Sequence, residues 1–321
     1  MPATSRQLLL IGGTPRGAIE RERVAKNLRS VHRGFYVDDD EWRSTLQAHL
    51  LRGGRTASVS HRAAARLHGL DGLRDYEAFD VTVSINSTFR ARPAFRSRTL
   101  NEDDVVLIGG IRVTSLERTL VDLGRVSSVN DVEVALESAL RGNDPMRPSD
   151  WNEGPFAALE RRLGSTRAPG SGVLREVIGR RPPGVRPTGS YAETRILQAL
   201  RLFGCRSLLR QPTFTVVDDL LKRYGTWYPD LYDPVSGVGI EVDGAVAHAK
   251  LGQRRRDAGR DNVLGDYVRV RRIVATDVEG EAARDFARNT AASIAQRRRD
   301  GWQVNNVNID VVGNAVSVRR K

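Results

Sequence analysis

The sequence predicts two structural parts, an α+β front half and an α/β back half. Its 321 residues exceed one ordinary domain of roughly 150 residues. The segment RRPPGVRPTGS, over 180–190, contains three prolines and two glycines, which break helix and strand patterns between two periodic regions. Behind it, the periodicity follows the order helix (190–202), three strands (213–217, 226–232 and 237–243), helix (252–264), strand (267–273) and helix (279–298). Gly313-Asn314, between two alternating runs, predicts the turn of a C-terminal hairpin. The segments expected are a winged-helix-like part over 1–56, an α+β region over 57–180, a linker over 181–190, an α/β domain over 191–300 and a C-terminal hairpin or tail over 301–321.

The front half is predicted to begin with a helix and a short strand. Residues 24–31 keep helical spacing, and the following HRGFYV, over 32–37, is typical of a strand. Together they favour a small winged helix. Two further helices are predicted over 46–51 and 58–69, the second with serine available at its N-cap and glycine just past its end.

The middle of the front half is predicted to form a sheet followed by helices. Apolar and polar residues alternate in FDVTVSI, over 79–85, which is the period-two pattern of a half-buried strand. Shorter apolar segments predict further strands over 94–98, 105–108 and 111–113. We expect these strands to form a small antiparallel sheet. Thr114-x-x-Glu117 is a capping box, which opens a run of helices that continues through Arg180.

Two segments of the front half carry a family resemblance: SVSHRAAARLHGL over 58–70 and IRVTSLERTLVDLG over 111–124. Through them the chain, over about residues 1–125, resembles the abortive-infection antitoxins of type IV toxin-antitoxin systems. The resemblance implies an N-terminal winged helix that binds promoter DNA. It also implies a following region that counteracts a nucleotidyltransferase toxin.

Four charged or polar side chains lie on the predicted helix of the first segment. Arg62 and Arg66 are candidate nucleic-acid contacts. His61 and His68 are expected to be helix-surface or packing residues, because nothing with metal-ligand spacing accompanies them. The front half therefore offers a binding surface rather than a catalytic centre.

Carboxylates gather on one strand and its neighbour in the back half. In GVGIEVDG, over 237–244, the valines and the isoleucine point to one face of the strand, whereas Glu241 and Asp243 point to the other. Asp230 follows Pro229 on the expected neighbouring strand and can approach them. Clustered carboxylates repel one another unless a cation or proton neutralises them. The sequence therefore predicts a divalent metal site.

The spacing of these acids carries a second resemblance. PD at 229–230, an eleven-residue step to the glutamate of EVD at 241–243, resembles the PD-(D/E)xK nuclease superfamily. More narrowly, GIEVDGAVAH is similar to the endonucleases of very-short-patch mismatch repair. The resemblance covers about 190–298 and implies an αβββαβ core that hydrolyses DNA with Mg²⁺ or Mn²⁺ and a metal-activated water. The metal ligands that it implies are Asp230, Glu241 and the Val242 carbonyl.

The chain departs from the superfamily pattern at one important position. Asp243 stands where the superfamily has its lysine, so that positive charge is not supplied from this strand. His248 keeps the spacing found in the mismatch-repair enzymes and is the candidate for acid/base or phosphate contact, with Lys250 as the nearby lysine. Ser190-x-x-Glu193 forms a capping box, and Glu193 stays open between that structural role and a metal-side role.

Five arginines of the back half are candidate phosphate contacts: Arg256, Arg260, Arg269, Arg271 and Arg272. The first two alternate with Asp257 and Asp261 at helical spacing, so exposed i,i+4 ion pairs explain them as well. The other three lie on or beside a predicted strand over 267–273, where they are placed to follow a DNA backbone.

The overall charge points to a polyanionic partner. The net charge is +12, divided equally between the first 189 residues and the rest, which favours DNA as the partner. No apolar run approaches the roughly 18 residues of a membrane span, so no membrane role is expected. The single Cys205 excludes an intramolecular disulfide and favours the cytoplasm.

Two functions follow from the sequence. The first is a DNA-binding protein whose back half is a Mg²⁺-dependent endonuclease, acting in phage defence or DNA repair. The alternative is a non-catalytic antitoxin or transcriptional regulator that uses the nuclease fold to bind nucleic acid or a toxin. The acids and His248 favour the enzyme, whereas the missing lysine favours the alternative.

Overall fold

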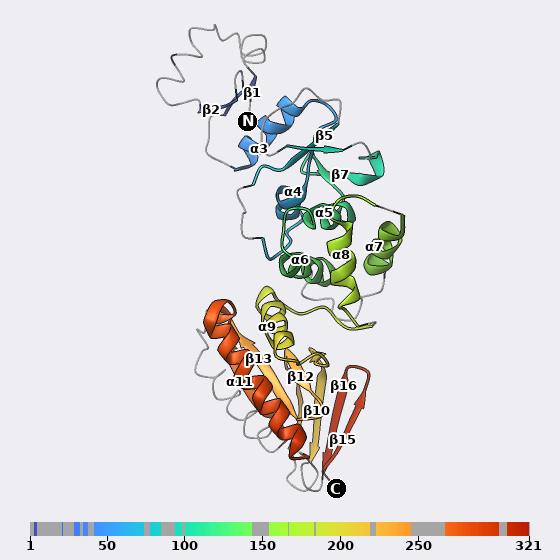
Figure 1. Cartoon of the computed structure of the whole chain (residues 1–321), viewed down its shortest axis with the longest axis vertical. Coiled ribbons are helices and arrows are strands. Elements are labelled where there is room, and N and C mark those ends of the chain that lie inside the picture. The colour runs from blue at the N-terminus through green and yellow to red at the C-terminus, as the bar shows by residue number, and fades with distance from the viewer. Residues whose placement is uncertain are drawn as a thin grey trace. The chain divides into compact units, whose positions relative to one another are not determined.

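The chain is a mixed α+β protein. The computed structural model describes residues 3–4, 21, 29–32, 35–37, 42–73, 78–84, 94–97, 100–142, 154–165, 167–182, 184–218, 223–244, 267–301 and 307–320. Two compact units are present: a front unit of Met1–Ala139 with Gly154–Ile178, and a back unit of Leu140–Glu153 with Gly179–Lys321 (Figure 1). Within the described ranges, no helix is both long and apolar enough to cross a membrane.

The front unit starts with a three-stranded antiparallel sheet in the order β1-β3-β2. Its strands are β1 (Ala3–Thr4), β2 (Arg29–His32) and β3 (Phe35–Val37). The sequence predicted one strand over 32–37. Instead, β2 ends at His32, β3 begins at Phe35, and the two strands pair antiparallel with each other. Most of residues 1–41, including nearly all of the predicted first helix, lie outside the described residues.

A five-stranded sheet in the order β6-β5-β4-β8-β7 forms the centre of the front unit. Its strands are β4 (Ser58–Val59), β5 (Val81–Ser84), β6 (Ala94–Ser97), β7 (Val105–Ile108) and β8 (Ile111–Thr114). Helix α3 (Trp42–Gly53) precedes β4 in the chain, and α4 (His61–Leu67) follows it. The predicted antiparallel sheet was wrong, because β4 pairs parallel with β8 and β5 pairs parallel with β6. Ser58-Val59, predicted as helix, is the fully buried strand β4 that pairs with β8, and α4 begins only at His61.

Helices complete the front unit: α5 (Leu116–Leu123), α6 (Val129–Arg141), α7 (Gly154–Ser165) and α8 (Ser171–Gly179). The predicted capping box at Thr114 was wrong by one residue. Ser115 caps α5 by accepting a hydrogen bond from the Arg118 N–H, because Thr114 ends β8 and bonds the Thr119 hydroxyl. The charged side chain of Arg118 is buried between Asp104 and Asp122, to which it donates.

The back unit contains two four-stranded mixed sheets, in the orders β14-β13-β12-β9 and β11-β10-β16-β15. Its elements are α9 (Tyr191–Leu202), β9 (Leu209–Arg210), β10 (Thr213–Asp218), β11 (Arg223–Trp227), β12 (Leu231–Asp233), β13 (Val238–Asp243), β14 (Arg269–Val274), α11 (Gly280–Arg299), β15 (Val307–Val312) and β16 (Ala315–Arg320). The predicted C-terminal hairpin was confirmed, with its turn at Gly313-Asn314.

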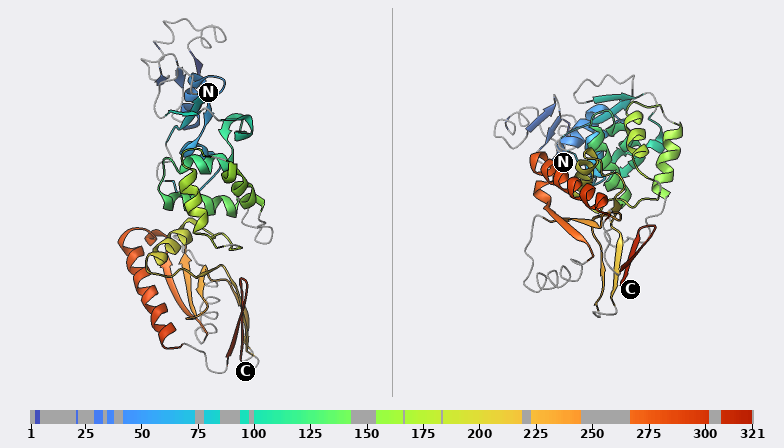
Figure 2. Two further views of the ribbon diagram at one scale, coloured as in Figure 1. Left: turned by 45° about the vertical axis from the view of Figure 1, so that its right-hand side comes forward. Right: turned by 60° about the horizontal axis from the view of Figure 1, so that its bottom comes forward.

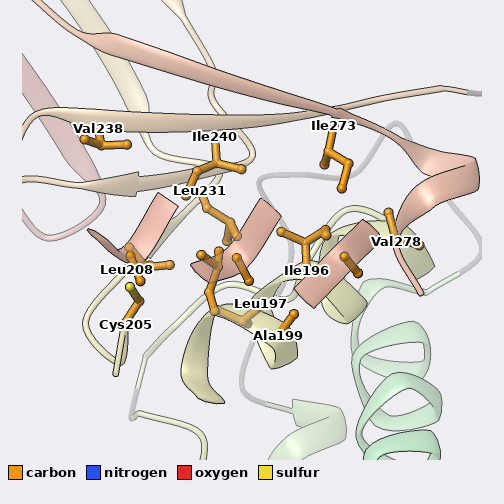
Figure 3. Close-up of a cluster of buried hydrophobic side chains, with 14 of the residues drawn as sticks. Ile196, Leu197, Ala199, Cys205, Leu208, Leu231, Val238, Ile240, Ile273 and Val278 are labelled. Atoms are coloured by element: carbon orange, nitrogen blue, oxygen red, sulfur yellow. The ribbon is translucent and has the colours of Figure 1, made fainter. Parts of the chain in front are cut away.

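Two cores lie on opposite faces of the β14-β13-β12-β9 sheet. Helices α9 and α11 cover one face (Figure 1, Figure 2), where Figure 3 shows Ile196 and Leu197 meeting Leu231 and Ile240. On the other face, side chains of β10, β11 and β16 enclose Tyr232 of β12. The back unit is therefore layered as helices, sheet, sheet.

Two strand predictions in the back unit were wrong in their assignment to a sheet. The strand predicted over 213–217 is β10, which belongs to the second sheet and pairs parallel with β16, whereas β9 occupies the edge beside β12. The strand predicted over 226–232 divides into β11 and β12, which lie in different sheets. The break falls at Pro229, which lacks the N–H that a continuing ladder requires.

Candidate functional site: a carboxylate cluster on the central sheet

The alternation predicted along β13 is present. Val238 and Ile240 are buried in the helix-side core, and Val242 packs against it. Glu241 lies on the opposite face, where its Oε1 accepts a hydrogen bond of 2.6 Å from the indole Nε1 of Trp227. Asp243, at the end of the strand, is exposed. The apolar residues therefore fix the strand and aim its carboxylates away from the helices.

Asp230 lies immediately before β12, beside β13. Its Oδ2 accepts a hydrogen bond of 2.7 Å from the backbone N–H of Val242, and its carbonyl accepts one of 2.9 Å from the N–H of Gln211. Burial raises the pKa of Asp230 to about 7, and the negative charges of Glu193, Glu241 and Asp243 contribute to the same shift. The predicted approach of Asp230 to the acids of β13 is therefore present.

Glu241 is held by two donors. Besides the indole of Trp227, the Nε of Arg272 donates to its Oε2 at 2.7 Å. These residues face each other because β13 and β14 run parallel with Glu241 opposite Arg272. The Glu241 side chain is 13% exposed and that of Arg272 is 38% exposed. The carboxylate thus sits at the border between the sheet interior and solvent.

Glu193 is the cap of α9. The hydroxyl of Ser190 accepts from the Glu193 N–H, and the Glu193 carboxylate in turn accepts from the Ser190 hydroxyl and the Gly189 N–H. The amide of Gln211 donates to the same carboxylate at 3.2 Å. The predicted serine cap was confirmed, and the Glu193 carboxylate reaches back to the Ser190 hydroxyl and the Gly189 N–H, one residue before the N–H that a capping box uses. Glu193 lies close enough to Asp230 to raise that residue's pKa.

The chemistry of the donors fits a hard divalent cation. Among the described residues, no three histidine, cysteine, aspartate or glutamate side chains form a ready-made metal cluster. Mg²⁺ needs no such cage, because it commonly binds one or two carboxylates, several waters and a substrate phosphate. Burial, and after it the neighbouring negative charges, raise the pKa of Asp230, and a bound cation would offset both effects. The arrangement suits a two-carboxylate site of Asp230 and Glu241 rather than a closed metal centre.

The arginines of β14 do not share one face. Arg271 lies over the ring of Phe286 on α11, on the helix side of the sheet, whereas Arg272 points to Glu241 on the other side. Arg269 is exposed and shares the face of Arg271 because side chains alternate along a strand. Of the three predicted phosphate contacts on β14, Arg272 is therefore the one beside the carboxylates.

The predicted nucleic-acid contacts of the front unit have partners within that unit. Arg62 forms a two-pronged ion pair with the fully buried Asp80, and Arg66 stacks over the ring of Trp42 at 4.1 Å. His61 was correctly predicted as a packing residue, since it is buried and stacks on Phe95 with 3.6 Å between ring centroids.

Several predicted site residues lie outside the described residues: His248, Lys250, Arg256, Asp257, Arg260 and Asp261, together with the helix predicted over 252–264. Sequence reasoning missed Trp227, the hydrogen-bond donor to Glu241. A signal was available, because an indole that ends a strand two residues before Pro229-Asp230 needs a partner for its N–H when it is buried.

No family model matches the chain, and no curated protein does.

Proposed function

We propose that the back unit is a metal-dependent endonuclease that hydrolyses phosphodiester bonds of DNA. The observation that carries this proposal is the convergence of Asp230 with the carboxylates of β13, where β12 begins and β13 ends in the middle of a mixed sheet, beside Arg272. A carboxyl whose pKa is raised by burial and by neighbouring negative charges, as that of Asp230 is, is characteristic of functional sites. The helix-covered sheet is built in chain order from α9, β9, β12, β13, β14 and α11, with β10 and β11 of the second sheet between β9 and β12.

Each residue of the site has a role in this proposal. Asp230 and Glu241 would hold Mg²⁺ or Mn²⁺, with the Val242 carbonyl as a further oxygen ligand. When bound, such an ion polarises a phosphate and lowers the pKa of its water toward neutrality. The Val242 N–H orients the Asp230 carboxylate, and Trp227 orients that of Glu241. His248 and Lys250 stay proposed as acid/base and charge-stabilising residues.

DNA is the proposed substrate because the chain carries a net charge of +12 spread over both halves. Neutralising phosphates with arginine releases counterions, so DNA affinity would fall steeply with salt. The front unit would add to this binding and would direct the protein to phage defence or DNA repair.

A second function, a non-catalytic antitoxin or regulator, is favoured by one specific observation. Both oxygens of Glu241 already accept hydrogen bonds from protein donors, Trp227 and Arg272, and Asp243 replaces the superfamily lysine. In this alternative the back unit binds nucleic acid without cutting it, and the front unit engages a nucleotidyltransferase toxin.

The test is incubation of the purified chain with single-stranded, duplex and mismatched DNA in Mg²⁺, Mn²⁺ or chelator. We expect cleavage that needs metal and is lost in Asp230→Asn and Glu241→Gln, which keep the size of each side chain and one of its two acceptor oxygens but remove its negative charge. Asp285→Asn removes an exposed carboxylate of α11 and is the matched control. Equal cleavage by wild type and both site variants would identify a contaminating nuclease. DNA binding without cleavage under all conditions would favour the regulator.

A further inference from the structure

We propose that Arg272 is a movable counter-charge of the carboxylate cluster. It pairs with Glu241 while no cation is bound, and it turns to the substrate phosphate once a divalent cation takes Oε2 of Glu241. This inference rests on the proposed nuclease function. It assigns to Arg272 the charge-stabilising role for which β13 carries no lysine.

The position of Arg272 follows from the sheet. Parallel pairing of β13 with β14 sets Arg272 directly opposite Glu241, and side-chain alternation puts both on the face away from α9 and α11. Arg271, the next residue, points to the helix side and lies over Phe286. The observed register therefore brings Arg272, and not Arg271, to the carboxylates.

The charge balance explains why an arginine is needed here. Asp230, Glu241 and Asp243 are like charges gathered at one place, since the Asp230 carboxylate accepts from the N–H of Val242, the residue between the two acids of β13. Without a cation, the guanidinium of Arg272 offsets part of this negative charge at a distance of 2.7 Å. A divalent cation brings twice the charge to the same oxygens, so it competes with Arg272 for Glu241.

Once it leaves Glu241, the guanidinium of Arg272 can donate to the substrate phosphate. β14 is an edge strand, and the Arg272 side chain is 38% exposed, so a partly solvated ion pair can open at little cost to stability. A phosphate bound to the cation would stand beside it, and arginine donates to phosphate oxygens in a two-pronged geometry. Arg272 would then stabilise the charge that develops on the phosphate during cleavage.

Two measurements of opposite sign test this proposal. The first is Mn²⁺ affinity by titration calorimetry without DNA, and the second is cleavage rate at saturating Mn²⁺. For Arg272→Gln we expect Mn²⁺ to bind about tenfold more tightly, because its competitor is gone. We expect cleavage to fall by about 10²-fold, because the charge at the phosphate is lost.

Two further variants serve as controls. Arg288→Gln breaks an exposed Arg–Asp ion pair on α11 and should change neither measurement. Arg272→Lys keeps the charge and should recover most of the lost cleavage. Because it preserves the ion pair, it also keeps the test valid if Arg272→Gln lowers the melting temperature.

Each outcome decides a different point. If Arg272→Gln binds Mn²⁺ as tightly as wild type or more weakly, Arg272 does not compete with the cation for Glu241. Its role would then be to orient Glu241, or it would have none at the site. Wild-type cleavage by Arg272→Gln overturns the role at the phosphate. A wild-type protein that neither binds Mn²⁺ nor cleaves DNA defeats the proposed function itself, and this inference fails with it.

Discussion

The indole Nε1 of Trp227 donates to Oε1 of Glu241 at 2.6 Å and thereby joins the two sheets of the back unit. Trp227 ends β11 in one sheet, whereas Glu241 lies on β13 in the other. The ring itself is buried against Phe214, at an edge-to-face angle of 72°. The orientation of a candidate metal ligand therefore depends on how the sheets pack together.

Trp227→Phe is expected to weaken both the fold and the site. The substitution leaves Glu241 without one donor and leaves space beside Gly239, so we expect a loss of about 2 kcal/mol in the free energy of unfolding. Mn²⁺ affinity should fall about tenfold, as when other groups that orient a metal ligand are removed. Urea unfolding and titration calorimetry measure the two effects.

Trp42→Phe is the matched control for this variant. Its indole N–H donates to the carbonyl of Ala78 in the front unit, so it loses a comparable bond far along the sequence from the carboxylates. It should lower stability and leave Mn²⁺ affinity unchanged. If Trp227→Phe also leaves Mn²⁺ affinity unchanged, Trp227 has only a packing role.

Gly239→Ala tests how closely the sheets approach beside the site. A Cβ at Gly239 would overlap Cη2 of Trp227 and lie 3.2 Å from Cγ1 of Val268. Both neighbours are buried, so neither ring nor strand has room to yield. We expect a loss of about 2 kcal/mol or more in the free energy of unfolding.

Gly244→Ala is the control, because no residue that the structure describes lies within 4 Å of the position that its Cβ would take. It should change stability by less than about 0.5 kcal/mol. Wild-type stability in Gly239→Ala would mean that the two sheets are not in tight contact at this point.

Local patterns predicted much of the back unit. Alternation along 238–243, the Ser190 cap and the Gly313-Asn314 turn each involve residues close in sequence, and each was confirmed. Sheet membership was not predictable in the same way. Thr213 pairs with Ala315 and Val59 pairs with Val113, and such partners are chosen by packing of the whole unit rather than by nearby residues.

The same distinction holds for the site. The acids were found from their spacing, because a period of two fixes the face on which Glu241 and Asp243 lie. The residues that donate hydrogen bonds to these acids were harder to predict. Arg272 was predicted as a phosphate contact, but its pairing with Glu241 depends on strand register, and Trp227 reaches Glu241 from another sheet.

His61 predicts a pH dependence of the front unit. It is buried, and its Nε2 has no hydrogen-bond partner among the described residues. Burial, followed by the charges of Arg125, Arg118 and Arg62, lowers its pKa from 6.5 to about 3. Below pH 6.5, therefore, His61 binds a proton in the unfolded chain but stays neutral in the folded chain. Its contribution to stability is present above pH 6.5 and is lost as the pH falls, by about 2 kcal/mol between pH 7 and pH 5.

His61→Asn isolates this contribution. Asparagine tolerates the left-handed backbone of residue 61, where φ is 50°, but does not titrate. Burial raises the pKa of Asp122 to about 6, so its contribution to stability grows as the pH falls, opposite to that of His61. Because wild type and variant both carry Asp122, this contribution cancels when their stabilities are subtracted. Urea unfolding at pH 7, 6 and 5 should show wild type losing about 2 kcal/mol relative to the variant. A constant difference across this range would mean that His61 is protonated in the folded chain.

The last prediction concerns Glu193, which either only caps α9 or also takes part in the metal site. Its carboxylate accepts from Gly189, Ser190 and Gln211, so its oxygens are committed to the cap of α9. We expect Glu193→Gln to change Mn²⁺ affinity by less than about threefold, because Asp230 and Glu241 supply the carboxylates that a Mg²⁺-type site requires. Titration calorimetry without DNA measures this affinity.

Ser190→Ala tests the cap without touching a carboxylate. Its hydroxyl accepts from the Glu193 N–H at 3.1 Å, and removing such an N-cap costs about 1 kcal/mol. Ser115→Ala removes the equivalent cap of α5 in the front unit, at 3.3 Å from the Arg118 N–H, and should have a similar effect on stability. Neither serine variant should alter Mn²⁺ binding. If Glu193→Gln weakens Mn²⁺ binding tenfold or more while Ser190→Ala does not, Glu193 belongs to the metal site as well as to the cap.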